Sequence, residues 1–261
     1  MFRPEIRLQG PANSGLPDYE NYRMSVRETA VAAAICTLML AAAALLCYNS
    51  LLAMILLSPY LVFYLKKKTA VKKEARKWQL DLQFADAIRS LSAALEAGYS
   101  VENGLAEAYR DLSVTYDKDA LIMTELRALM GEIKNNVPVE DALAGFAARS
   151  GVDDIAGFAD VFATAKRTGG NIIAIIRSTT DMIRNGIELK RDIRTAMSAA
   201  KYESDIMKLV PFGVLLYLRI FSPGMIGSLY GSVSGAAFMT VILVLYVLLS
   251  ELSERLVKIE L

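Results

Sequence analysis

The amino-acid sequence predicts an all-α, polytopic membrane protein in which two transmembrane helical hairpins flank a cytoplasmic helical bundle. Three observations support this prediction. Of the 261 residues, 54% are hydrophobic, more than an ordinary soluble domain contains. Two blocks, 29–65 and 209–250, carry almost no charge. The segment between these blocks is strongly charged and shows the apolar periodicity of helices.

The first apolar block, 29–65, has 37 residues without a charged side chain. One helix needs about 20 apolar residues to cross a bilayer, so the block has the length of two short crossings. The polar residues at 48–50 offer the turn between them. A single long tilted span and a secretory signal peptide are the alternatives, but the length of the run and the basic flank after it argue against a signal peptide.

Basic residues on both sides of this block predict its orientation. The N-terminal segment, 1–28, contains four arginines, and the run 66–77 contains seven Lys or Arg and one acid. Lys and Arg collect on the cytoplasmic side of membranes, so both flanks are predicted to be cytoplasmic. Nucleic-acid binding is the alternative for the run 66–77. We predict no nucleic-acid partner, because the run adjoins an apolar span and Trp78 is its only aromatic neighbour.

The middle segment, 66–208, is predicted to form a cytoplasmic bundle of about six helices. Its apolar residues recur at spacings of three and four, first at 84, 88, 91 and 95, which is the period of one buried helix face. Residues typical of helix ends separate the helices, and they are Gly98, Ser100, Pro138, Gly169, Gly170 and Asn171. The helix that begins at Asn171 meets no strong breaker before Pro211, so we expect it to join the bundle to the second apolar block.

The second apolar block, 209–250, contains one charge, Arg219, and is predicted to turn between 222 and 235 before the cytoplasmic tail, 251–261. Arg219 lies 11 residues past Lys208, which corresponds to about 16 Å of depth. A cation there usually faces a partner helix or a polar group, and snorkelling to an interface is the alternative. Three glycines recur every four residues, as in close helix packing or an external turn: Gly227, Gly231 and Gly235.

No catalytic, metal or cofactor site is predicted, and the chain is predicted not to be an enzyme. It has no His, and both cysteines, Cys36 and Cys47, lie in the first apolar block. Zinc sites of the His/Cys type and Ser-His-Asp triads are therefore excluded. The glycines at 169–170 follow a helix and not a strand, so they suit a helix-to-helix turn better than a phosphate loop. The S-x-x-K match at 198–201 has no partner motifs.

Three stretches of the middle segment resemble a known family: EAGYSVENGLAEA (96–108), VPVEDALAGFAARSG (137–151) and AKRTGGNIIAIIRSTTDMIR (165–184). Their order and spacing are similar to the type II secretion system F family, the inner-membrane platform proteins of type IV pilus-like machines. The resemblance extends to the apolar segment that begins at 206. Because we find no internal repeat, the chain looks most like the tight-adherence (Flp) pilus platform proteins, which carry this domain once.

The resemblance implies a non-enzymatic, multi-pass platform in the cell membrane, with both termini and the central domain cytoplasmic and no cofactor. The implied partners are the lipid bilayer, further copies or a second similar platform protein, a hexameric secretion ATPase, and pilin-like subunits. The alternative is a channel or transporter subunit with a cytoplasmic regulatory helical domain. Such a subunit should show several polar residues along its spans, whereas Arg219 stands nearly alone.

Overall fold

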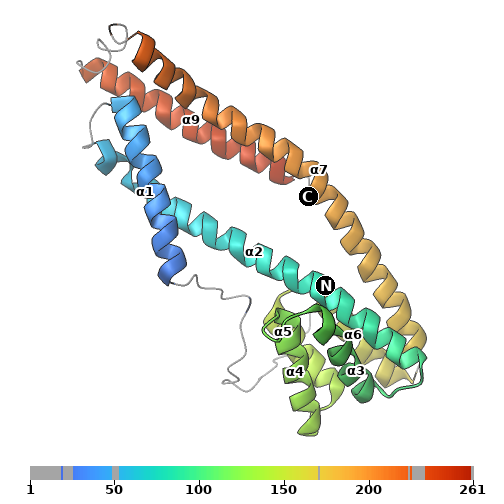
Figure 1. Cartoon of the computed structure of the whole chain (residues 1–261). Helices are drawn as coiled ribbons and strands as arrows, with labels where there is room; N and C mark the ends of the chain where they lie inside the picture. Colours follow the sequence, from blue (N-terminus) through green and yellow to red (C-terminus); the bar gives the residue numbers. More distant parts are fainter. Residues whose placement is uncertain are drawn as a thin grey trace, which may run out of the picture. The chain divides into compact units, whose positions relative to one another are not determined.

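The computed structural model describes residues 19, 26–48, 53–169, 171–222, 224 and 233–259. Every regular element in these ranges is an α-helix, which confirms the all-α prediction (Figure 1). The chain divides into two compact units. The bundle unit comprises Met1–Arg23 and Ala70–Ile187, and the apolar unit comprises Met24–Thr69 and Glu188–Leu261.

Four short helices form the body of the bundle unit. They are α3 (Val101–Thr115), α4 (Leu121–Lys134), α5 (Val139–Ser150) and α6 (Asp153–Thr168). Each packs on the next along the chain, as short connections between neighbouring helices favour. Figure 1 shows these four helices grouped with the end of α2 and the start of α7. The predicted helices of the middle segment are therefore present.

The bundle core is built from the apolar faces that the sequence periodicity predicts. On α2, Phe84, Ile88 and Leu91 are buried, and each of the helices α3 to α6 adds a similar stripe. The ring of Phe84 meets two other rings edge to face, with centroids 6.0 Å from Phe146 and 5.5 Å from Phe158. Edge-to-face contacts stabilise aromatic pairs beyond the burial of their area.

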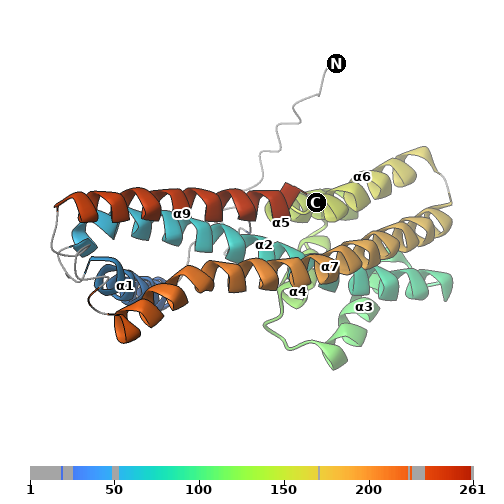
Figure 2. The ribbon, with the colours of Figure 1, turned by 90° about the horizontal axis from the view of Figure 1, so that it is seen from above.

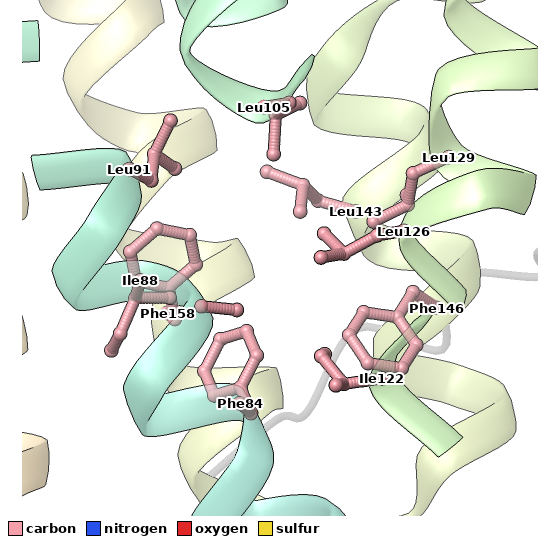
Figure 3. A pocket seen from close by; sticks show the side chains of 11 residues that line it. Phe84, Ile88, Leu91, Leu105, Ile122, Leu126, Leu129, Leu143, Phe146 and Phe158 are labelled. Atoms are coloured by element: carbon pink, nitrogen blue, oxygen red, sulfur yellow. The ribbon is translucent and has the colours of Figure 1, made fainter. Parts of the chain in front are cut away.

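A small apolar cavity of about 20 Å³ lies inside this core (Figure 3). The labelled side chains come from the five helices α2 to α6 and point toward one another around it. The volume suits one water molecule, but every lining side chain is apolar, so a water there would lack hydrogen-bond partners. The cavity is therefore a dry packing defect and not a ligand site.

Two long helices pass from one unit into the other. They are α2 (Ala53–Glu96, 44 residues) and α7 (Ile172–Phe221, 50 residues). The continuity of α7 toward the second apolar block was predicted. The continuity of α2 through the basic run 66–77 was not, because that run was interpreted only as a membrane flank. Lys, Arg, Glu and Ala are strong helix formers, so the run prolongs the helix.

The apolar unit contains α1 (Val26–Tyr48) and α9 (Val233–Ile259) besides its parts of α2 and α7. Figure 2 shows this group from a second direction. Within the described residues, α1 alone is long and apolar enough to cross a membrane, over Val26–Leu46, and the apolar stretch Ala237–Ser253 of α9 is shorter. The structure thus supports one crossing, and the two hairpins stay a prediction.

Candidate functional site

The residues predicted at the α2–α3 turn lie beside each other between the two helices. Gly98 follows α2 with φ of 92°, a left-handed conformation that favours glycine. Ser100 precedes α3, and its hydroxyl accepts a hydrogen bond from the N–H of Asn103 at 3.3 Å. This bond satisfies one of the N–H groups that have no partner within a helix at its start.

Pro138, Gly169 and Asn171 also lie at helix ends. Pro138 occupies the N-cap position of α5 with φ of −55°. Gly169 ends α6 with φ of 67°, and Asn171 Oδ1 accepts a hydrogen bond from the N–H of Ala174 at 3.2 Å. Gly170 lies outside the described residues. These positions shape the backbone turns of the bundle.

Arg219 lies in the last turn of α7, two residues before the helix ends at Phe221. Its Nη1 donates a hydrogen bond to the main-chain carbonyl of Leu45 in α1. Leu45 is among the last four residues of α1, whose carbonyls have no partner within the helix and carry the negative end of its dipole. Arg219 therefore caps the C-terminal end of α1.

Polar side chains of α9 connect it to three other helices of the apolar unit. The hydroxyl groups of Tyr48 in α1 and Thr240 lie 2.8 Å apart. Lys67 Nζ in α2 lies 3.1 Å from Glu251 Oε2, and the Tyr246 hydroxyl donates to a main-chain carbonyl of α7 at 2.7 Å. Hydrogen bonds between helices in a membrane stabilise their packing by about 0.6–2 kcal/mol each. These contacts suit helices that must stay associated in the membrane.

Of the three regularly spaced glycines, only Gly235 lies within the described residues, as the third residue of α9. Gly227 and Gly231 lie outside them. A site formed by all three glycines, whether for close helix packing or for an external turn, therefore stays a prediction.

The structure reveals a buried ion pair that the sequence analysis missed. Glu125 in α4 is fully buried, and its Oε2 lies 3.1 Å from Arg149 Nη2 at the end of α5. A second carboxylate, Glu132, lies 3.9 Å from the same guanidinium. The signal was present in the sequence, because Glu125 stands three residues after Ile122 and four before Leu129 on the buried face of the same helix. Breaking such a buried pair typically costs about 3–5 kcal/mol.

Tyr19, a residue of the N-terminal segment, lies next to this ion pair and is only 3% exposed. Its N–H donates to the main-chain carbonyl of Arg149 at 3.3 Å. Burial raises the pKa of Tyr19, and the negative charge of Glu125 raises that pKa further. Burial also raises the pKa of Glu125, although Arg149 opposes that effect.

Three polar atoms in this cluster are buried without a hydrogen-bond partner in the described part of the chain: Tyr19 Oη, Glu125 Oε1 and Arg149 Nε. Each such atom costs about 1–3 kcal/mol. Burial of the aromatic ring of Tyr19 contributes about 1.5–3 kcal/mol in the opposite direction.

The described residues contain no group of three or more side chains that could hold a metal ion. In the described part of the bundle, the pKa is shifted at Tyr19 and Glu125, which are buried beside an arginine, and at Glu140, whose pKa is lowered by the hydrogen bond from Lys166. None of these three groups lines the cavity. The arrangement found here serves packing and helix association, and it brings no nucleophile together with a base.

The model of the family described as Type II secretion system (T2SS), protein F matches residues 87–218, just over half of the 261-residue chain. The matched range begins in the last part of α2, includes α3 to α6, and ends near the end of α7. No curated protein and no solved structure matches the chain.

Proposed function

Because the chain belongs to the type II secretion system protein F family, we propose that it is the inner-membrane platform protein of a type IV pilus-like assembly machine. The observation that carries this proposal is the extent of the family match, which covers almost the whole helical bundle and continues along α7. Two helices that pass from the bundle into apolar segments suit a protein that relays force between the cytoplasm and the membrane.

The finer proposal is a tight-adherence type of platform that couples a hexameric cytoplasmic ATPase to the extraction of pilin-like subunits. The resemblance of the bundle sequence to tight-adherence platform proteins supports this subtype. The platform performs no chemistry itself under this proposal. It acts with further copies or with a second similar platform protein.

The α3–α4 connection offers the ATPase a charged surface. Asp117, Lys118 and Asp119 are consecutive and exposed there, and α4 begins two residues later. Exposed charges of this kind steer association and are screened by salt. Deleting a whole helix would not test the contact, because α5, for example, contributes the fully buried Phe146 to the core. Charge reversal at exposed positions leaves that core intact.

We expect the full chain in nanodiscs to bind the secretion ATPase encoded nearby, and to bind it less tightly as salt is raised. Reversing both acids, Asp117→Lys with Asp119→Lys, should weaken binding about tenfold at low salt, which corresponds to about 1.4 kcal/mol. Surface plasmon resonance over a salt series measures both effects. Asp160→Lys on the exposed face of α6 is the matched control and should change the affinity little.

Three results would contradict this assignment. Hydrolysis of ATP by the purified chain alone would favour an enzyme. Equal affinity of wild type and the α3–α4 variant would exclude the charged connection as the contact. The absence of any binding would remove the ATPase as a partner.

We also expect four membrane crossings, with both termini and the bundle in the cytoplasm. In a variant without Cys36 and Cys47, a membrane-impermeant maleimide should label Ser50→Cys and Ser232→Cys in spheroplasts. It should not label Ser113→Cys, whose position on α3 is exposed. Lysis should make Ser113→Cys reactive, which serves as the control. The reverse labelling pattern would overturn the topology.

A further inference from the structure

Helix α7 contains a proline, Pro211, inside its apolar part. Proline has no N–H, so the carbonyl four residues earlier, that of Met207, receives no hydrogen bond from this position. The proline ring also crowds that carbonyl, and such crowding opens the helical turn before a proline. A helix interrupted in this way bends more easily unless a neighbouring group stabilises the open turn.

Tyr246 of helix α9 supplies a hydrogen-bond donor to this turn. Its hydroxyl donates to the main-chain carbonyl of Lys208, and the two oxygen atoms lie 2.7 Å apart. Lys208 lies three residues before Pro211, so the bonded carbonyl belongs to the turn that the proline ring opens. A carbonyl oxygen has two lone pairs, so the tyrosine can bond to it from outside the helix.

The ring of the same tyrosine contacts the other side of the proline. Tyr246 meets Phe212 edge to face, with ring centroids 5.4 Å apart and planes at 89°. Phe212 follows Pro211 directly, so one side chain contacts α7 both before and after its proline. A further contact joins the same two helices, between Ser204 Oγ and Ser253 Oγ at 3.0 Å. All of these residues belong to the apolar unit, in which Figure 1 shows α9 running along the last part of α7.

We propose that Tyr246 is a clamp on the proline bend of α7. Its hydroxyl holds the carbonyl of Lys208 and its ring holds Phe212, so the helix keeps one bend angle at Pro211. The proline creates the weak point, and the clamp stiffens it for as long as α9 stays paired with α7. The stiffness of α7 at this point therefore depends on α9. This role needs only the helix pair and is independent of the function proposed above.

Double electron–electron resonance between two spin labels on α7 measures the bend. Labels at Ser198→Cys and Ile220→Cys occupy exposed positions, one on each side of Pro211, in the full chain in nanodiscs after removal of its two native cysteines. Along a straight helix their backbone positions are about 33 Å apart. Tyr246→Phe keeps the ring and loses only the hydroxyl, so the distance distribution should broaden at least about 1.5-fold.

Two further variants separate the clamp from an ordinary contact between helices. Pro211→Ala restores the missing N–H, so in this background Tyr246→Phe should change the width of the distribution by less than about 1.2-fold. Tyr202→Phe is the matched control, because Tyr202 lies on the same helix and is 71% exposed, and it should leave the width unchanged. Thermal unfolding in detergent gives a second measurement. Tyr246→Phe should lower the Tm by about 2–4 °C, and by less than about half as much in the Pro211→Ala background.

Three results would overturn the clamp. A distance distribution that Tyr246→Phe leaves unchanged means that the hydroxyl does not hold the bend. Equal broadening in the wild-type and Pro211→Ala backgrounds means that the hydrogen bond acts independently of the proline. Equal broadening by Tyr202→Phe means that the effect is not specific to Tyr246.

Discussion

Replacing Phe146 by alanine is expected to destabilise the bundle by about 3–5 kcal/mol, a large part of the roughly 5–15 kcal/mol that holds a typical domain folded. Phe146 is fully buried, and its ring meets Phe84 edge to face at 6.0 Å. The ring also lines the existing cavity, so its removal enlarges a void that the core already fails to fill. The core has little freedom to collapse onto the vacated space.

Urea titration of the detergent-solubilised full chain, followed by tryptophan fluorescence, measures this loss. Trp78 is the only tryptophan and packs against the bundle core, so its signal reports the bundle separately from the apolar helices. Val114→Ala on α3 is the matched control, because Val114 is 87% exposed and its truncation should cost less than about 0.5 kcal/mol. A loss below about 1 kcal/mol for Phe146→Ala would show that the core is far more adaptable than its burial indicates.

Replacing Arg219 by leucine is expected to have two opposite effects. Insertion of the second apolar block should become easier, because an arginine inside a membrane helix costs up to about 2.5–3.5 kcal/mol at the centre and less near the ends. Association of α7 with α1 should weaken by about 1–3 kcal/mol, because the carbonyl of Leu45 loses its donor. Under the proposed function, fibre assembly should therefore fall although more protein reaches the membrane.

Three measurements separate these effects: the amount of protein in the membrane, its thermal stability in detergent, and fibre assembly in cells. Ile220→Leu changes the exposed neighbour of Arg219 and should match wild type in all three. Arg219→Lys keeps a cationic donor and should retain part of the stability. If Arg219→Leu assembles fibres normally and is as stable as wild type, the arginine only snorkels toward the interface.

The bundle was predictable because each of its helices buries one face and ends at a recognisable residue. The spacing of Ile122, Leu126 and Leu129 in α4 reflects one buried face, and Gly98 and Ser100 mark a turn. The boundary of α2 was not predictable in the same way. Lys and Arg are good helix formers and also collect at the cytoplasmic ends of membrane spans. The basic run 66–77 was interpreted only as such an end, so the continuation of α2 through it was not predicted.

The spacing of residue types in the sequence did not predict the polar contacts between distant residues. The partner of Arg219 is a main-chain carbonyl, which every residue possesses, so nothing in the residue types distinguishes Leu45. The main-chain hydrogen bond between Tyr19 and Arg149 joins residues that lie 130 positions apart, a separation that no helical period predicts. The burial of Glu125, by contrast, could have been predicted, because its position places a charged residue on the buried face of α4.

The prolines of the two long helices have a consequence for how strain travels along them. An uninterrupted helix resists bending and twisting because hydrogen bonds couple each turn to the next, and a proline removes one of these bonds. Pro211 lies ten residues before the end of α7, and Pro59 lies six residues after the start of α2, both within the apolar unit. No proline occurs in 60–96 of α2 or in 172–210 of α7. Each helix is therefore expected to bend more easily at its proline, among the apolar helices, than along its uninterrupted part toward the bundle.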